Sequence, residues 1–283
     1  MTLSENFRLR SSSASSPSAH HESWRRPVRT ILLTKARPWI LPVLLVAAWQ
    51  AAASAGLIPP YILPAPSAVL GAASGLIASG ELFDHLLVSS ARALGGFVIG
   101  ATIGFAFGFL NGVSKTSEEY LDTTLQMIRN VPHLALIPLV ILWFGIEEQS
   151  KLFLVALGVF FPIYINTFHG IRTVDRQLIE MGRIYGLSSR QLFWRVILPG
   201  ALPSIFVGVR YALGIMWLTL IVAETIAASS GLGYMAMQAR EFLLVDVVVL
   251  GITIYALLGK LADTAARLLE RHYLAWHPSF QVH

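Results

Sequence analysis

Apolar stretches of about twenty residues with few charges recur along this chain, and they constrain its fold more than any other feature. A helix needs about 20 apolar residues to cross the hydrocarbon core of a bilayer. The sequence predicts six such spans, near residues 39–58, 92–113, 123–145, 151–171, 203–227 and 244–262. Only 13% of the 283 residues are charged and 55% are hydrophobic, which is too little charge to cover a water-soluble core. The composition therefore excludes an ordinary soluble enzyme and predicts an all-α membrane protein.

The distribution of basic residues predicts which side of the membrane each connection faces. Lys and Arg collect in cytoplasmic loops. Here they gather in residues 1–37, around Lys115 and in residues 172–195. The opposite connections hold only three basic residues, at the edges of spans: Arg92, Lys151 and Arg240. We therefore expect both termini to be cytoplasmic, and the net charge of +5 to mark mainly the cytoplasmic face.

The predicted domain organisation follows from the spans. Residues 1–30 are Ser-rich and without apolar periodicity, which predicts a mobile cytoplasmic tail. Residues 31–275 form the six-span domain, in which residues 172–202 are a long cytoplasmic connection between the fourth and fifth spans. Residues 276–283 form a second cytoplasmic tail.

Five glycines in the second span are each four residues apart: Gly96, Gly100, Gly104, Gly108 and Gly112. On a helix such residues form one stripe without side chains, which lets a second helix approach closely in lipid. Lining of a pore is the alternative, and close packing is the interpretation that we favour.

Polar and irregular positions inside the spans indicate where a substrate path could lie. Pro132 and Pro138 interrupt the third span, and irregular backbone within a membrane is tolerated where it is buried in protein or lines a cavity. Candidate path residues lie near these prolines and in the fifth span: Arg129, Asn130, His133, Trp217 and Glu224. The alternative for Glu224, as for Arg210, is that the side chain snorkels to the membrane surface or forms an ion pair with another span, because an unpaired charge in lipid is costly.

The sequence lacks the motifs of several enzyme classes. There is no phosphate-binding G-x-x-x-x-G-K-[ST] loop, no H-E-x-x-H and no Cys among the 283 residues. The histidines have no metal-ligand spacing. We therefore predict no catalytic residue, no bound metal and no cofactor in this chain.

The connection between the fourth and fifth spans has the pattern of two short helices joined by a sharp turn. A first helix through Glu180 should end at Gly186, because glycine allows the positive φ of a helix C-terminus. Ser188 can cap a second helix, which should stop before Pro199. Four apolar residues lie in this polar segment: Leu187, Leu192, Phe193 and Trp194. A solvated loop does not need them, whereas a docking surface for a cytosolic partner does.

This segment resembles the E-A-A-x-x-x-G signature of permease subunits of bacterial ABC importers. Glu180 and Gly186 match the signature, and Leu198-Pro199 matches its later part. Two residues stand where the signature has alanines: Met181 and Gly182. In that family this segment is the coupling helix, which fits a groove on the ATP-hydrolysing subunit.

The resemblance extends over roughly residues 38–278. There the chain is similar to the sulfonate/nitrate/taurine group of these permeases, and most of all to aliphatic-sulfonate permeases. The matching runs are residues 125–139, 143–146, 161–167, 222–227 and 267–271.

The resemblance implies a type I ABC importer permease in the bacterial inner membrane. Two copies of the chain would form a homodimer around the path, and two ATP-binding subunits would dock on the coupling helices. ATP and Mg²⁺ would be used by those subunits and not by this chain. A periplasmic or lipid-anchored binding protein would deliver the substrate. Membrane lipids are the remaining expected contact, and nucleic acid is not a partner.

The resemblance also implies which residues couple the permease to the ATPase: Glu180, Gly186, Leu187, Ser188, Phe193, Leu198 and Pro199. Two alternatives stay open. One is a taurine or nitrate permease of the same family. The other is a self-contained secondary transporter or channel, which would leave the apolar cytoplasmic segment unexplained.

Overall fold

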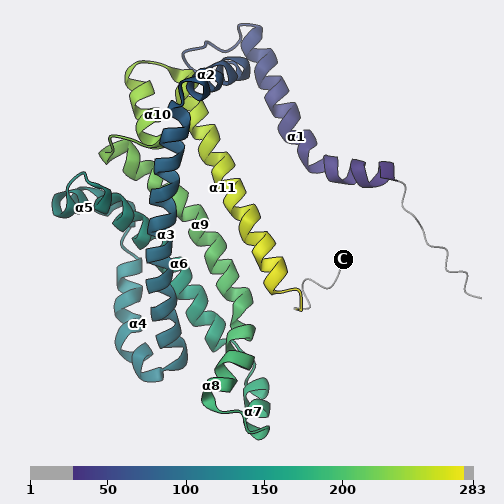
Figure 1. The fold of residues 1–283 in the computed structure, drawn as a ribbon, viewed down its shortest axis with the longest axis vertical. Helices are drawn as coiled ribbons and strands as arrows, with labels where there is room; N and C mark the ends of the chain where they lie inside the picture. The colour runs from purple at the N-terminus through teal and green to yellow at the C-terminus, as the bar shows by residue number, and fades with distance from the viewer. Residues whose placement is uncertain (1–27, 277–283) are drawn as a thin grey trace, which may run out of the picture. The chain divides into compact units, whose positions relative to one another are not determined.

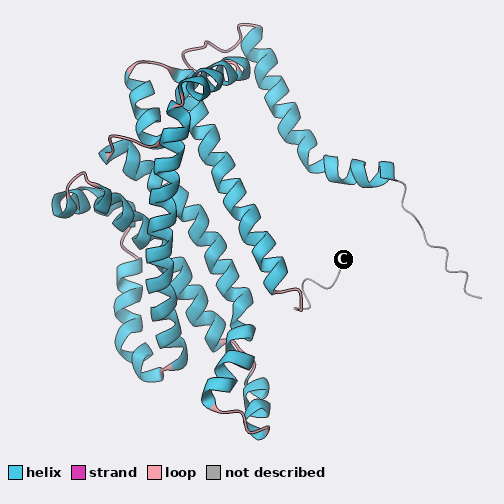
Figure 2. Cartoon of the chain, in the orientation of Figure 1, coloured by secondary structure: helices cyan, strands magenta, loops and turns pink. Residues whose placement is uncertain are grey.

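The computed structural model describes residues 28–276, which are largely helical and contain no strand (Figures 1 and 2). The chain divides into two units between Ala48 and Trp49, inside helix α1 (Val28–Ser54). In the first unit, the side chains from Trp39 to Ala48 are exposed and mostly apolar. The predicted tails, residues 1–30 and 276–283, lie almost entirely outside the described residues.

The second unit holds the remaining helices in the following order: α2 (Pro66–Ser79), α3 (Glu81–Val113), α4 (Lys115–Arg129), the 3-10 helix η1 (His133–Leu136), α5 (Ile137–Phe144), α6 (Glu148–Arg172), α7 (Arg176–Ile184), α8 (Ser189–Leu192), the π-helical turn η2 (Phe193–Ile197), α9 (Leu198–Ala227), α10 (Leu232–Glu241) and α11 (Val245–Tyr273).

Four helices of this unit are long and apolar enough to cross a membrane, namely α3, α6, the continuous run Ser189–Ala227, and α11. A fifth span results if α4 and the pair η1–α5, which are bent by 79°, form one broken span. Trp39–Ser54 and α2 are shorter apolar helices. By length and composition, the described residues therefore hold four or five of the six predicted spans.

The break between α4 and η1 lies at the predicted irregular position. Pro132 has an extended ψ of 108°, and Pro138 occupies the first turn of α5, where a missing N–H is tolerated. The two prolines therefore end one helical segment and begin another, and the prediction of an irregular third span is confirmed.

The glycine stripe of α3 packs directly against α6, and the two helices lie side by side (Figure 1). A Cβ added to Gly96 would lie 2.6 Å from the Val155 side chain, and one added to Gly108 would lie 2.6 Å from the Tyr164 carbonyl oxygen. Real Cβ contacts are longer, so only glycine permits this approach. The favoured prediction of close packing is confirmed.

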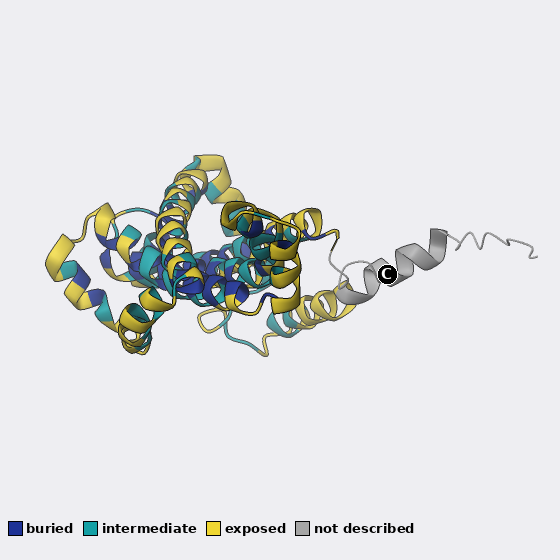
Figure 3. Ribbon diagram, turned by 90° about the horizontal axis from the view of Figure 1, so that it is seen from below, coloured by how far each residue is buried: buried dark blue, intermediate teal, exposed yellow. Residues whose placement is uncertain are grey.

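Helix α6 meets α9 on its other side through a second set of small residues. An added Cβ at Gly158 would lie 2.9 Å from Thr219 Oγ1, and one at Gly208 would lie 2.9 Å from the Pro162 carbonyl oxygen. Buried residues fill the middle of the bundle, while its outward faces are exposed (Figure 3). Because those faces carry large apolar side chains such as Leu94 and Leu218, they suit a lipid surrounding.

Candidate functional site

The turn between α7 and α8 forms as its residue types dictate. Asp175 caps α7 by accepting a 2.8 Å hydrogen bond from the Gln177 N–H. Gly186 has a φ of +75°, and its N–H donates to the Arg183 carbonyl at 2.9 Å. The predicted glycine turn after the first helix is therefore confirmed.

Ser188 caps α8 as predicted, in a capping box with Gln191. The Ser188 backbone N–H donates to Gln191 Oε1 at 3.0 Å, while the Gln191 N–H donates to Ser188 Oγ at 3.4 Å. This reciprocal pair fixes the direction in which the chain leaves the turn.

Gly182, which stands where the family signature has alanine, lies against α8. A Cβ there would come within 2.7 Å of Leu192 Cδ1, and the Leu192 side chain is buried. The glycine thus allows α7 and α8 to pack together. The prediction that Leu192 belongs to an exposed docking surface is wrong, because this residue fills the contact between the two short helices.

The exposed apolar surface of this segment lies mainly on α7 and not on α8. Ile184 and Tyr185 are 85% and 79% exposed, and Leu178 and Met181 are exposed beside them. From the predicted set only Trp194 is exposed, since Leu187 is half-buried and Phe193 packs edge-on against Phe109 with ring centroids 5.0 Å apart. We call the four α7-side residues Leu178, Met181, Ile184 and Tyr185 the α7 face. Glu180 is exposed in the same helix.

Pro199 does not end the second helix, which corrects the prediction of a stop before it. The run Ser189–Ala227 is continuous, through the π turn of η2 and into α9. Pro199 lies in the first turn of α9, and the preceding π turn shifts the hydrogen-bond register, so the missing N–H is accommodated. Leu198 and Pro199 are half-buried. The α7–α8 segment is thus joined to a long helix without an intervening loop.

A pocket of about 310 Å³ lies where α4 and η1 meet α6 and α9. Its walls are largely apolar, and its polar members are Arg129, His133, Asn166 and the hydroxyl-bearing Tyr211. His133 Nε2 lies 3.0 Å from Thr219 Oγ1. Arg129 is exposed and forms no hydrogen bond or ion pair within the described part of the chain. The pocket can therefore offer an unpaired guanidinium next to an apolar surface.

The other three predicted path residues lie elsewhere. Asn130 is exposed at the C-terminal end of α4 and does not line the pocket. Trp217 is buried, with its ring 6.0 Å from that of Tyr255, and its Nε1 has no acceptor among the described residues. Glu224 is fully buried.

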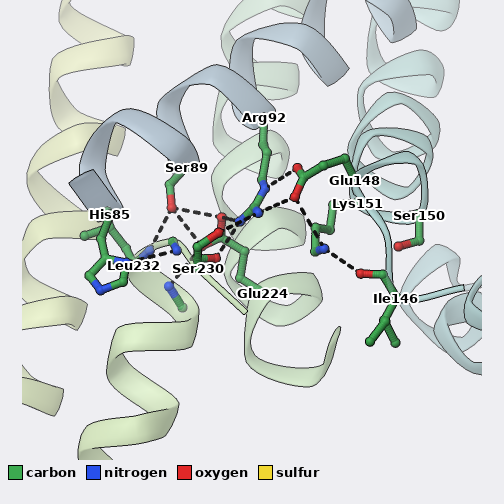
Figure 4. Close-up of polar contacts among 12 residues, drawn as sticks. His85, Ser89, Arg92, Ile146, Glu148, Ser150, Lys151, Glu224, Ser230 and Leu232 are labelled. Atoms are coloured by element: carbon green, nitrogen blue, oxygen red, sulfur yellow. Dashed lines mark hydrogen bonds and ion pairs between the residues drawn. The ribbon is translucent and has the colours of Figure 1, made fainter. Parts of the chain in front are cut away.

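Glu224 lies at the centre of a polar cluster in which several helices meet (Figure 4). Its carboxylate accepts hydrogen bonds from Ser89 Oγ at 2.8 Å, from an Arg92 terminal nitrogen at 2.9 Å and from the Tyr255 hydroxyl at 3.0 Å. The Gly233 N–H donates to it as well, at 2.9 Å. These bonds satisfy a buried charge, which is otherwise very unfavourable.

Arg92 links this carboxylate to Glu148, the first residue of α6. The Arg92 Nε donates to Glu148 Oε2 at 2.6 Å, and a terminal nitrogen donates to Oε1 at 2.5 Å. Arg92 also donates to the carbonyl oxygen and hydroxyl of Ser230. Lys151 Nζ lies 3.7 Å from Glu148 Oε1. We call Ser89, Arg92, Glu148, Lys151, Glu224, Ser230 and Tyr255 the Glu224 cluster.

The connector between α9 and α10 leaves room for this cluster because it is rich in glycine. A Cβ at Gly231 would overlap the Glu224 carboxylate, and one at Gly233 would lie 2.6 Å from Glu224 Cβ. Gly231 also has a φ of +108°, which favours glycine. The connector Ser229–Gly233 thus encloses the buried carboxylate.

Arg92, Glu148 and Lys151 were not among the predicted site residues. Helix α3 begins at Glu81, so Arg92 lies within it and is buried. A signal existed, because a carboxylate in an apolar span requires a cation from another span. Arg92 and Lys151 lie on the non-cytoplasmic side in the predicted topology and were the available partners for Glu224.

Arg210 confirms the alternative of a pair with another helix. Its Nε lies 3.3 Å from Asp263 Oδ1 of α11, and a terminal nitrogen lies 3.6 Å from Glu270 Oε2. Among the described residues no three His, Asp or Glu side chains come together as a metal site.

A bundle of long apolar helices with an exposed apolar segment at its end fits a membrane-embedded subunit. A comparison with protein-family models agrees, because residues 96–274 match the family described as the inner membrane component of binding-protein-dependent transport systems. The chain belongs to this family of ABC importer permeases.

Individual relatives extend the match beyond the family model. SsuC of Escherichia coli (strain K12), named an aliphatic sulfonates transport permease protein, is 63% identical over 256 residues, which are 90% of this chain and 97% of that protein. SsuC of Bacillus subtilis (strain 168), named in the same way, is 50% identical over 86% of this chain and 88% of that protein. The taurine transport system permease protein TauC of Escherichia coli (strain K12) is 37% identical over 84% of this chain and 88% of that protein.

Membership of this family confirms the prediction of an inner-membrane permease subunit that is not itself an enzyme. It also excludes the alternative of a self-contained channel or secondary transporter, because the family works with a binding protein.

Proposed function

We propose that this chain is the permease of an ATP-driven importer that moves aliphatic sulfonates across the inner membrane. The observation that carries the substrate class is the 63% identity to a relative named for aliphatic sulfonates, along nearly the whole of that relative. The identity to the taurine permease is 37% over a similar length. Taurine is therefore the second candidate.

The proposed assembly is a type I importer with two copies of this chain, two ATP-binding subunits and a periplasmic or lipid-anchored binding protein. ATP and Mg²⁺ are bound by the ATP-binding subunits. In the proposed topology Trp39–Ser54 completes a first span, which gives six spans and cytoplasmic termini. The basic residues of 172–195 support this topology, because they then lie on the cytoplasmic side.

The α7 face is the proposed docking surface for the ATP-binding subunit. Three exposed apolar side chains on a nine-residue helix, with Tyr185 directly after it, would be unfavourable in water and are buried if a partner covers them. Glu180 is proposed to contact that partner directly. Gly186, Leu187 and Ser188 shape the turn. The half-buried residues that follow are proposed to transmit the movement of the docked ATP-binding subunit into α9: Phe193, Leu198 and Pro199.

The pocket beside Arg129 is the proposed substrate path. An alkanesulfonate has an anionic head and an apolar tail, and this pocket offers an unpaired guanidinium beside an apolar wall. Arg129 and His133 are the proposed contacts, with Asn130 at the adjacent helix end. Trp217 and Glu224 are buried and do not line this pocket. We propose that they hold α9 in place through their contacts with neighbouring helices.

Growth on single sulfonates as the sole sulfur source tests the function. Deleting this chain should abolish growth on alkanesulfonates and spare growth on sulfate, and the intact chain should restore it. Loss of growth on taurine alone would favour the second candidate. Unchanged growth on every sulfonate would contradict the proposal.

A further inference from the structure

The exposed edge of the Glu224 cluster has the form of an occupied oxyanion site. Glu148 is the one carboxylate of the cluster that reaches solvent, with 56% of its side chain exposed, whereas the Arg92 side chain is 4% exposed. The Glu148 carboxylate holds the Nε edge of Arg92 through two parallel hydrogen bonds (Figure 4). A guanidinium binds a carboxylate and other planar or tetrahedral oxyanions in this same bidentate way.

Lys151 is a second cation near Glu148, and it forms no hydrogen bond with the Glu148 carboxylate. Lys151 Nζ donates to the carbonyl oxygens of Ile146 and Glu147, at 2.8 and 3.3 Å. An ammonium has three donors, and the third has only the 3.7 Å ion pair with Glu148 Oε1, which is longer than a hydrogen bond. At that distance the Glu148 carboxylate does not accept a hydrogen bond from Lys151, so the third Lys151 donor has no acceptor among the described residues.

The N-terminus of α6 adds to the positive potential at this place. Glu148 is the first residue of α6, and Glu147, the residue before it, provides no side-chain cap. The first amide N–H groups of this 25-residue helix therefore have no side-chain acceptor. A helix N-terminus of this kind favours an anion next to it.

We propose that Glu148 is a displaceable internal substitute for a sulfonate, and that Arg92, Lys151 and the start of α6 form an entry subsite for the sulfonate head group. This inference rests on the proposed function for the identity of the substrate and for the outward position of Glu148. A sulfonate has three oxygens, so two can replace the Glu148 carboxylate on Arg92 while the third accepts from Lys151. The subsite therefore prefers a sulfonate to a carboxylate of equal length.

Charge balance makes such an exchange feasible. With Glu148 in place, two cations face two carboxylates, Glu148 and Glu224. When the half-exposed Glu148 turns into solvent and one sulfonate enters, the balance is unchanged and Glu224 keeps its own partners. One bidentate oxyanion replaces another, so the net binding free energy is small. Weak binding suits a subsite through which a substrate passes, because release is fast.

Equilibrium binding of radiolabelled butanesulfonate to the full-length chain in lipid nanodiscs tests this subsite. Glu148→Ala removes the internal competitor, and the affinity should rise about tenfold, which corresponds to the loss of a competing charged hydrogen-bonded pair. Glu147→Ala is the matched control, since it removes the adjacent carboxylate, whose side chain makes no hydrogen bond or ion pair with the described residues. It also removes a negative charge near Lys151, so it should raise the affinity slightly and much less than Glu148→Ala does.

A second experiment tests whether the third sulfonate oxygen accepts a hydrogen bond from Lys151. In Glu148→Ala, butanesulfonate should displace the label at lower concentration than butyrate, and adding Lys151→Gln should remove this preference. If sulfate displaces the label at the same concentration as butanesulfonate does, the site recognises the anionic head group alone. If Glu148→Ala unfolds at a lower temperature than the unmodified chain, Glu148→Gln is used instead, because it keeps the size of the side chain. The expected gain in affinity for butanesulfonate is then smaller.

The proposal is overturned if neither Glu148 variant gains affinity over Glu147→Ala, or if butyrate binds as well as butanesulfonate. Neither result bears on the proposed function, which is judged from growth. Conversely, a chain that fails the growth test but gains affinity in Glu148→Ala keeps the oxyanion subsite and loses its assignment to transport.

Discussion

The α3–α6 seam and the α7–α8 turn both depend on glycine, but for different physical reasons. In the seam, Gly104 and the other stripe glycines remove side chains so that two backbones can touch, and α3 is held against α6 from Gly96 to Gly112. At the turn, Gly186 has open space around it and is needed only for its positive φ. One region is fixed by contacts that fill space, whereas the other is shaped by backbone conformation and leaves its apolar side chains uncovered. Substitutions should therefore affect stability in the first region and partner coupling in the second.

Glu224→Gln should have the largest effect on stability. It removes one charge of a buried ion pair and leaves Arg92 with a single carboxylate, at an expected loss of about 3 kcal/mol in the free energy of unfolding. Denaturant unfolding in detergent measures it. The control is Asp263→Asn, which also removes a carboxylate paired with an arginine but at a partly exposed site, where about 1 kcal/mol or less is expected. Equal losses would show that burial of the pair is not decisive.

Gly104→Ala should have the next largest effect. The added Cβ would meet the Phe160 carbonyl oxygen at 2.5 Å, so α3 and α6 must separate, and about 2 kcal/mol of unfolding free energy should be lost. The same unfolding measurement applies. Gly214→Ala is the control on α9, because nothing lies within 4 Å of its added Cβ, and it should be neutral or slightly stabilising. A matching loss at both positions would contradict the close-packing role.

Gly186→Ala should destabilise the chain by only about 1 kcal/mol, because an alanine is strained at positive φ while no contact is lost. Sulfonate uptake should fall by more than this loss of stability explains, since the turn orients the α7 face. Sulfonate uptake and unfolding are measured on the same preparation. Asn tolerates this backbone conformation, so Gly186→Asn should recover uptake, and failure of this rescue would argue against a conformational role.

Glu180→Lys should change the unfolding free energy by no more than about 0.5 kcal/mol, because the side chain is exposed. Stimulation of ATP hydrolysis by the binding protein should nevertheless fall in the reconstituted importer. Glu119→Lys makes the same charge change on exposed α4 and should leave the stimulation intact. Normal stimulation in the Glu180 variant would remove this residue from the docking surface.

The difference between the two regions also explains which features were predictable from the sequence. The five glycines of α3 repeat with the helical period, so the packing face could be inferred from spacing alone. The Ser188 cap and the Gly186 turn are local, and each follows from a few adjacent residues. These features were predicted and are confirmed.

The features that were missed depend on contacts between distant segments. Arg92 and Glu148 are 56 residues apart, and nothing in the spacing of either predicts the other. Leu192 resembles an exposed apolar residue until Gly182 packs against it. Pro199 is a helix stop by local rules, and the π turn before it, which has no sequence signal that we recognise, overrides that rule. Tertiary contacts and a local register shift are the physical reasons for these errors.

The absence of a stop at Pro199 has a mechanical consequence. The 39 residues of Ser189–Ala227 form one rod about 58 Å long, with the α7 face at one end and Glu224 near the other. A tilt of about 5° at the docking end would move the far end by about 5 Å, if the rod is stiff. Its hydrogen-bond pattern is irregular at the π turn Phe193–Ile197 and at Pro203, which has no N–H to donate. The stiffness of these two places would set how much of the motion of the proposed ATP-binding partner reaches the far end.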